Sequence, residues 1–498
     1  MVGYLDDITL GGPESVVSGD IERVSAASTE LGLFLNRRKC EVIHEADYHP
    51  TSENLDEFIH FTPAEATLLG TALFAGQALD DLLSAKLDEL RRAIERLEKI
   101  SAHDALLMLR SALSAPKLMY TLRTPPCSDN PILTSFDALL RDGLCRIANV
   151  DISDLQWIQA SLPIKDGGLG IRSVSTLAPS AFLASAAGTY ELQSSILLRT
   201  NLPVTPAQGH SDSAVDETLS IWQARYDAGQ PDGSEAGKQR AWDMASVRAG
   251  KDILWMNAED SYTRARLLAT SAPHSGDWLL AIPISSCGLR LDDEAIRIAV
   301  GLRLGCKIGE PHDCVCGELV DARGSHSLSC KHGSGRLARH HSINDLIHRA
   351  LIRANNPSIE EPTYGKGLLR TDNKRPYGFT PIPWKAGRNL TWDVSTVNTV
   401  AASYIQTTSV IAGGATEIAS ERQIVKYVEL SNTSCFCPII FETFGSINDL
   451  GLFFLDELGR RIADCTGDVR ETTHLLQRIS DSRCRPSVPC SRRAHPVS

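Results

Sequence analysis

Apolar residues along the first 75 positions follow two different spacings. A short strand-like segment at residues 5–10 ends at the turn cluster 11–13, and Ile21, Val24 and Leu31 then recur at helical spacing before Gly32. A glycine directly after the last apolar position of a helix usually supplies its left-handed end. The pattern therefore predicts short strands around one helix.

The next segment, up to residue 200, has the spacing of amphipathic helices. Leucine and isoleucine recur every three or four residues, and paired prolines at 125 and 126 mark a stop. The run Lys-Asp-Gly-Gly at 165–168 predicts a turn between two further helices. We therefore expect an all-α middle region, with helices over 79–97, 105–122, 130–147 and 176–198.

The character of the sequence changes twice more. Residues 200–240 hold few large apolar side chains and contain the run Gly-Gln-Pro-Asp-Gly-Ser, which favours a linker. From Trp278 onward His, Cys, Gly and Arg concentrate, and strands are then expected near 390–397 and 438–442 with helices over 341–354 and 412–430. This pattern predicts a separate α/β unit.

The fold class that follows is α+β and multidomain. The last residues are rich in Ser, Arg and Pro, have little to bury, and are therefore expected to be disordered. The expected segments are 1–75 with strands around a helix, 76–200 helical, 201–277 a linker or helical region, 278–335 rich in Cys and His, 336–478 α/β, and 479–498 a disordered tail.

Composition and charge narrow the class of protein. The chain has 498 residues, of which 42% are hydrophobic, and it lacks the run of about 18 apolar residues that a membrane span needs. We therefore expect an intracellular protein, nuclear or cytoplasmic, without a membrane partner. The net charge of -11 opposes whole-chain attraction to nucleic acid, but residues 321–400 carry twelve Lys/Arg against six Asp/Glu. That local excess of +6 marks the segment expected to face phosphates.

Three motifs occur in order near the N-terminus. They are Tyr-Leu-Asp-Asp at 4–7, Gly-Leu-Phe-Leu-Asn-Arg-Arg-Lys-Cys-Glu at 32–41 and Leu-Leu-Gly at 68–70. In this order and spacing they resemble the end of the palm in non-LTR retrotransposon reverse transcriptases. The resemblance implies that Asp6 and Asp7 are catalytic carboxylates for Mg²⁺, that 32–41 is a strand, and that Leu-Leu-Gly forms a primer-grip hairpin.

The resemblance also implies a thumb and a limit on activity. The helices of 79–125 look like the thumb, where Arg91, Arg92 and Arg96 would lie along template-primer phosphates, although a solvated helix face explains them equally well. In that family a further aspartate and the fingers precede the Tyr-x-Asp-Asp turn, whereas Met1, Val2 and Gly3 precede it here. The polymerase site is therefore expected to be incomplete, with Mg²⁺ binding that is weak at best.

A cluster of cysteines and histidines begins at residue 314. Thirteen cysteines spread over 498 residues do not form the dense framework of a small secreted domain, so reduced thiols or a metal site are favoured. Thiolates and imidazole suit tetrahedral Zn²⁺, and a Cys-x-Cys-Gly turn can aim two sulfurs at one ion. The predicted ligands are Cys314, Cys316, His326 and Cys330; recruitment of Cys306, or a core of reduced cysteines without metal, are the alternatives.

The cysteine and histidine cluster is followed in order by Glu-Pro at 361–362, Lys-Arg-Pro-Tyr-Gly at 374–378, Trp-Asp-Val-Ser at 392–395 and Lys-Tyr at 426–427. With these motifs, residues 278–460 resemble the restriction-like endonuclease domain at the C-terminus of site-specific non-LTR retrotransposons. That nuclease class uses acids on neighbouring strands to hold a metal and a lysine to support the attacking hydroxide. The resemblance implies roles for Glu361, Asp393 and Lys426, whereas Tyr377 and Gln423 stand where an aspartate and a lysine are expected. Asp393 is equally well explained as a strand-end acid paired with Lys or Arg. The residues expected to contact DNA phosphates are Arg336, Arg339, Lys374 and Arg375.

These patterns together predict a retroelement-derived protein. Its ancestral activity would be RNA-directed DNA synthesis combined with endonuclease nicking of the target, and here it would be reduced to binding DNA and RNA. One alternative is a metal-dependent DNA endonuclease that still acts through its remaining carboxylates. The other is a domesticated zinc-containing DNA-binding protein. The sequence favours no particular oligomeric state.

Overall fold

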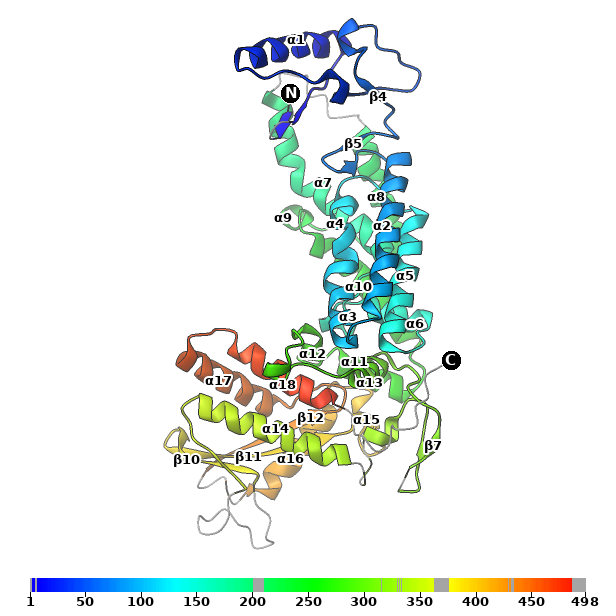
Figure 1. Ribbon diagram of the computed structural model, residues 1–498. Coiled ribbons are helices and arrows are strands. Elements are labelled where there is room, and N and C mark those ends of the chain that lie inside the picture. Colours follow the sequence, from blue (N-terminus) through cyan, green and yellow to red (C-terminus); the bar gives the residue numbers. More distant parts are fainter. Residues whose placement is uncertain are drawn as a thin grey trace. The chain divides into compact units, whose positions relative to one another are not determined.

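The fold was taken from a computed structural model of the chain (Figure 1). It describes residues 2–4, 7–199, 210–314, 316–328, 330, 332, 334–361, 376–428, 430 and 434–485. The protein is a multidomain α+β protein, as predicted. It forms two compact units that interleave along the chain: unit 1 contains residues 1–88, 118–133 and 178–242, and unit 2 contains 89–117, 134–177 and 243–498.

Unit 1 begins with short strands around a helix, as the apolar pattern predicts. Strand β1 (Val2–Tyr4) pairs antiparallel with β2 (Asp7–Thr9), and β3 (Glu41–Ile43) pairs parallel with β4 (Ile59–Phe61). Between them lies α1 (Glu14–Glu30). Gly32, at φ +76°, ends this helix, because Gly32 and Leu33 donate their N–H groups to the carbonyls of Thr29 and Ser28.

The two other motifs of this region differ in outcome. Leu-Leu-Gly forms the predicted hairpin between β5 (Thr67–Leu68) and β6 (Thr71–Ala72), since Leu69 and Gly70 both have positive φ, as a type I′ turn requires. The strand expected over 32–41 is wrong except at its end. Residues 37–39 form a 3₁₀ turn, η1 (Arg37–Lys39), and Leu33 and Phe34 are exposed, so no neighbouring strand stabilises an extended conformation there.

The helical region of unit 1 includes residues 210–240. Residues 210–240 belong to the segment expected to be a linker or a helical region, and they form α8 (His210–Tyr226) and α9 (Gly233–Ala236), which is the helical alternative. Trp222 is 1% exposed and packs edge to face on Trp242 with ring centroids 5.0 Å apart, so two aromatic side chains stabilise a segment that is otherwise polar. The other helices with residues in this unit are α2 (Gln77–Leu97), α4 (Ala115–Arg123), α7 (Val174–Arg199) and the first turns of α5 (Pro131–Ala148) and α10 (Gln239–Met256).

Unit 2 contains a helical part that confirms most of the predicted helices. The single helix expected over 105–122 is an exception, because it is divided into α3 (Ala102–Met108), a π-helical turn η3 (Leu109–Leu113) and α4. Pro116 has no N–H to continue the ladder, and the backbone turns at Ser114 before α4 begins. The remaining elements up to residue 304 are α5 (Pro131–Ala148), α6 (Asp154–Ser161), η4 (Ile164–Asp166), α11 (Ser261–Thr270), α12 (Asp277–Leu280), η5 (Ser285–Cys287) and α13 (Asp293–Leu304).

The C-terminal part of unit 2 is built on a four-stranded mixed sheet in the order β12-β11-β10-β9. The long strand β11 (Arg388–Val397) lies antiparallel to β10 (Gly378–Lys385) and parallel to β12 (Ser434–Glu442), while β10 also pairs with the short β9 (Ile359–Glu360). Because side chains alternate along a strand, Trp392 and Val394 face one side of the sheet and Asp393 the other.

Helices cover both faces of this sheet (Figure 1). Helices α14 (Ser334–Arg353), α17 (Asp449–Thr466) and α18 (Glu471–Cys484) share one core with Trp392 and Val394, both fully buried. On the other face, Tyr427 at the end of α16 (Gly414–Lys426) packs with Phe379 and Phe436 of the strands. The single turn α15 (Ile405–Thr408) precedes α16. The predicted strands and helices of this region are confirmed.

The expected disordered tail begins too early. Residues 479–484 continue α18, where Ile479 is 1% exposed and Asp481 is fully buried. The hydroxyl of Ser480 accepts a hydrogen bond from the N–H of Trp278 at 3.2 Å, so this end of the chain is tied to α12. Apolar residues at helical spacing in 475–479 extend the core. The prediction of disorder rested on the Ser, Arg and Pro content of the last residues and overlooked this spacing. Residues 486–498 lie outside the described part of the chain.

Among the described residues, the structure contains no helix long and apolar enough to span a membrane.

Candidate functional site

A short hairpin positions the first two sulfurs of the cysteine and histidine cluster. β7 (His312–Asp313) pairs antiparallel with β8 (Leu319–Val320), and Cys314 and Cys316 lie in the connecting loop. The loop closes through a hydrogen bond from the N–H of Cys314 to the carbonyl of Glu318 at 2.8 Å. Gly317 takes φ +87°, a conformation that favours glycine, so the Cys-x-Cys-Gly pattern has a direct structural reason.

The other two ligands come from the 3₁₀ helix η6 (Ser325–Leu328) and the residue that follows it closely. The N–H of Cys330 donates to the carbonyl of His326, which places both side chains against the hairpin. The sulfurs of Cys314 and Cys330 are 3.4 Å apart, and that of Cys316 is 3.1 Å from Nε2 of His326. The four ligand atoms all lie within 4.8 Å of one another, so the group can hold a metal ion.

The donor set fits a tetrahedral site. Zn–S bonds of about 2.3 Å place two thiolates of a tetrahedron roughly 3.8 Å apart, close to the spacing found here. Cys306, the alternative ligand, belongs elsewhere: it is 1% exposed, and burial raises the pKa of its thiol to about 12 while the nearby Arg266 opposes this. The predicted set Cys314, Cys316, His326 and Cys330 is the one that the structure brings together.

Of the Tyr-Leu-Asp-Asp segment at 4–7, the structure describes only the backbone of Tyr4 and Asp7. The hairpin β1–β2 places Tyr4 opposite Asp7, as expected for a Tyr-x-Asp-Asp turn. Asp6 and the side chain of Asp7 lie outside the described part of the chain. On α2, Arg91, Arg92 and Arg96 are exposed, whereas Leu90, Ile94 and Leu97 of the same helix are buried.

In the four-stranded sheet, the structure brings Asp393 and Lys426 together. Nζ of Lys426 lies 3.8 Å from Oδ2 of Asp393 and donates a hydrogen bond to Oη of Tyr427 at 2.7 Å. Tyr427 Oη in turn donates to Oδ2 of Asp393 at 3.4 Å. These three side chains form a compact cluster at the face covered by α16, which we call the Asp-Lys-Tyr cluster.

The cluster has an unusual carboxylate. Burial raises the pKa of Asp393 to about 6, and the charge of Lys426 together with the hydroxyl of Tyr427 only partly offsets this. The side chain of Asp393 is 15% exposed and that of Lys426 is 36% exposed. Asp393 is therefore largely desolvated beside one cation, which is the ion pair that the alternative interpretation of this residue expected.

Glu361, Tyr377 and Asp393 follow or precede residues that are paired with one another on three neighbouring strands, so their backbones lie at the same level of the sheet. Gly378 pairs with Glu360 on one side and Trp392 on the other, and the N–H of Glu361 donates to the carbonyl of Tyr377 at 2.6 Å. The Tyr377 ring packs edge to face on His340 of α14, with centroids 5.3 Å apart. Burial first, and then the negative charges of the neighbouring acids, raise the pKa of Tyr377 to about 12.

The position where a lysine was expected has a different role. Nε2 of Gln423 donates to Oγ of Ser395 at 2.7 Å, so this amide binds the sheet two residues beyond Asp393. It fixes α16 on β11 without contributing charge. The sequence gives no signal for the role of Tyr427, because its contact with Asp393 depends on the packing of α16 on the sheet.

One expected phosphate contact is corrected. Arg339 is 6% exposed and lines an internal cavity, so it does not belong to an open basic surface. Its position on α14 places it against α13, α18 and the ends of β11 and β12, which line the same cavity. The side chain of Arg336 and all of Lys374 and Arg375 lie outside the described part of the chain.

The whole sequence matches no model of a known protein family and no curated protein.

Proposed function

We propose that this chain is a nucleic-acid-binding protein derived from a non-LTR retroelement, with a zinc-stabilised C-terminal unit that no longer cleaves DNA. The ordered motifs described above support the origin. The Cys and His group supports zinc, since three sulfurs and one imidazole nitrogen favour that ion over the hard cations Mg²⁺ and Ca²⁺.

The observation that carries the proposal is the Asp-Lys-Tyr cluster. A nuclease of this class needs a carboxylate and a lysine close together on its sheet, and Asp393 of the inner strand β11 lies beside Lys426 of α16. A metal-dependent cut also needs further carboxylate oxygens around the ion. The groups that act on Asp393 are instead an ammonium and a phenol, which compete with a cation for its oxygens. This favours binding without cleavage over the endonuclease alternative.

Strand cleavage should therefore be undetectable with Mg²⁺ or Mn²⁺ on supercoiled DNA. Conversion to nicked circles, followed by gel electrophoresis, measures it. Introducing Tyr377→Asp together with Gln423→Lys restores the acid and the lysine that the nuclease class uses, and is expected to recover metal-dependent nicking. Asp393→Ala in that background should remove it again. Nicking by the unmodified protein that Asp393→Ala abolishes would establish the endonuclease alternative instead.

RNA-directed DNA synthesis should likewise be absent. Phosphoryl transfer by two metals requires several rigid carboxylates and a pocket for the incoming nucleotide, and the Tyr-x-Asp-Asp hairpin supplies only part of this. Primer extension on a primed RNA template is the measurement. Extension that disappears with Asp6→Ala plus Asp7→Ala would show that the chain retains a complete polymerase site.

Binding of nucleic acid is expected to depend steeply on salt. Replacing Arg91, Arg92 and Arg96 by alanine should weaken binding of a primed template and lower the slope of log K against log salt by up to about three units, one per lost phosphate contact. Fluorescence anisotropy at about 50 to 300 mM KCl measures the binding affinity and its dependence on salt. An unchanged slope would identify these arginines as a solvated helix face.

A control for this experiment removes charge elsewhere. Arg460, on the exposed side of α17, pairs with Glu457 and Asp464 and can be replaced by alanine without reaching the core. Arg460→Ala should leave the salt slope unchanged. A fall in slope equal to one third of that in the triple variant would mean that net charge, and not the α2 surface, determines binding.

A further inference from the structure

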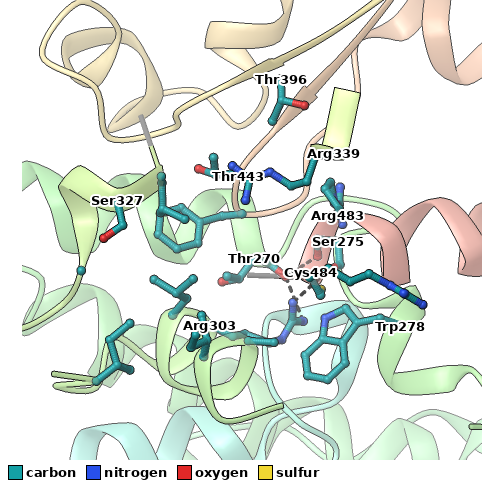
Figure 2. Close-up of a pocket in the computed structure, with 18 residues that line it drawn as sticks. Thr270, Ser275, Trp278, Arg303, Ser327, Arg339, Thr396, Thr443, Arg483 and Cys484 are labelled. Carbon is teal, nitrogen blue, oxygen red and sulfur yellow. Dashed lines mark hydrogen bonds between the residues drawn. The ribbon is translucent and has the colours of Figure 1, made fainter. Parts of the chain in front are cut away.

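A cavity of about 90 Å³ lies within unit 2, on the side of β11 and β12 where those strands end. Its wall is drawn from α11, α12, α13, η6, α14, α18 and the ends of both strands. Figure 2 shows the side chains that surround it. The polar and charged residues of the wall are Thr270, Ser275, Arg303, Ser327, Arg339, Thr396, Thr443, Arg483 and Arg485.

Four arginines contribute to this wall, and three of them are buried. Arg303, Arg339 and Arg483 are 4%, 6% and 8% exposed. No aspartate or glutamate is among the residues that line the cavity within the described part of the chain. Buried cations are costly unless an anion or several dipoles compensate them, so the partners of these arginines decide what the cavity can bind.

Two of the buried arginines are held mainly by neutral groups. Arg303 donates to the carbonyls of Gly168, Ser275, Ile164 and Thr270, and Figure 2 shows part of this network. Arg483 donates to the carbonyl of Gly445 at 2.6 Å and to the hydroxyl of Ser480 at 3.2 Å. These hydrogen bonds hold the guanidinium groups in place. Because carbonyl and hydroxyl oxygens carry no net charge, the bonds do not cancel the positive charge of the arginines.

The carboxylates behind the wall neutralise this charge only in part. Glu442 and Asp277 attract Arg483, and Asp481 accepts a hydrogen bond from Arg485 at 3.3 Å. Burial raises the pKa of Asp481 to about 6 and raises that of Glu442 as well. Burial, with a smaller effect from the charge of Arg483, lowers the pKa of Arg303 to about 10, so the arginines repel one another.

Hydroxyl groups complete the lining. Oγ1 of Thr396 is buried and has no hydrogen-bond partner among the described residues. Ser327 lies on η6, next to the metal-ligand candidate His326. In Figure 2 the guanidinium of Arg339 is turned toward Thr443 at the end of β12. Arginine guanidinium groups and hydroxyls that line one small space are the usual donors for a tetrahedral oxyanion.

We propose that this cavity binds a terminal phosphate group. A water molecule occupies about 30 Å³, so the cavity has room for the volume of roughly three waters, enough for a phosphate and too little for a nucleoside. A phosphomonoester also carries more charge than a backbone phosphodiester, and it can enter such a space end-on. Arg485, whose side chain is 53% exposed, lies where the ligand's remaining part would leave the cavity. The proposal stands independently of the function proposed above.

The first test measures binding of inorganic phosphate to the full chain in a phosphate-free buffer. Calorimetry and thermal denaturation at constant ionic strength should show saturable binding and a rise in Tm, because a ligand that binds only the folded state stabilises it. Arg339→Gln and Arg485→Gln should each weaken the affinity at least about tenfold, as expected for a lost charge-assisted hydrogen bond. The matched control Arg470→Gln, at an exposed arginine paired with Asp468, should leave it unchanged.

Two further variants separate a binding role from a structural one. Arg339→Lys keeps the charge and should fold and bind with intermediate affinity, while Ser327→Leu fills the cavity without removing any charge and should abolish binding. Circular dichroism checks the fold of each. No saturable phosphate binding by the unmodified protein would overturn the proposal, as would equal affinity in the control, Arg339→Gln and Ser327→Leu variants.

The source of the phosphate is distinguished by comparing ligands. Inorganic phosphate, a nucleoside 5′-monophosphate and short single-stranded DNA with either a 5′-phosphate or a 5′-hydroxyl serve as probes. If the phosphate belongs to a DNA end, the 5′-phosphorylated strand should bind more tightly than its 5′-hydroxyl counterpart, and Ser327→Leu should remove that difference alone. Phosphate binding without such a preference identifies a small-molecule ligand.

Discussion

Replacing Cys314 and Cys330 together by serine is expected to remove one zinc ion per chain and to unfold residues 306–332. Both sulfurs are nearly buried, at 6% and 3% exposure, and beside them only Val320 and Cys316 form the local apolar cluster. Such a cluster is too small to order a loop of this length by itself. Zinc binding in small metal-dependent folds supplies roughly 10 to 16 kcal/mol at neutral pH, so its loss should exceed any local compensation.

Elemental analysis and hydrogen exchange measure this result. The unmodified protein should contain about one zinc, as a four-ligand site requires, and amides of β7, β8 and η6 should lose protection when a chelator is added. The matched control exchanges Cys287 and Cys465, both exposed, for serine and should keep its zinc. Full zinc content in the Cys314 and Cys330 variant would assign the metal to other ligands.

Several elements could be predicted because their signals are local. The leucines of α2 recur on one face and are buried as their spacing requires, with Leu79, Leu83 and Leu90 each 1% exposed. Gly32 and the Leu69-Gly70 turn occupy positive φ, which their sequence context indicates. The metal ligands are also local, because one hairpin and one short helix supply all four. Patterns that depend on a few neighbouring residues survive the folding of the whole chain.

Features that depend on distant contacts were missed or left open. The order of α18 comes from its packing on α12, α14 and α17, which composition alone does not show. Arg339 was assigned to a basic surface from local charge, but α14 places it in the interior of unit 2. The segment 210–240 is helical through the Trp222–Trp242 contact. In each case tertiary packing overrides a polar composition, because one or two buried side chains determine whether the segment is ordered and which side chains it buries.

Replacing Asp393 by asparagine is expected to stabilise the protein at pH 8. The folded-state pKa of Asp393 is about 6, above its usual value near 4, so the folded state holds the proton more tightly than the unfolded chain. Its contribution to stability is complete below pH 4 and is lost as the pH rises through 6. Asparagine keeps the shape and has no charge to desolvate, which gives a gain of about 2 to 3 kcal/mol at pH 8 and about half of that at pH 5.

Urea denaturation of both proteins at the two pH values measures this gain, with exposed Asp464→Asn as the control that should show none. Lys426 loses a partner in the variant, but its partly exposed ammonium can turn to water, so this loss is smaller than the desolvation removed. A stabilising substitution at a carboxylate is typical of a site kept for chemistry and not for folding. Destabilisation of equal size at both pH values would instead make the Asp393–Lys426 ion pair a structural contact, and the resemblance of this sheet to a nuclease site would then rest on its strands alone.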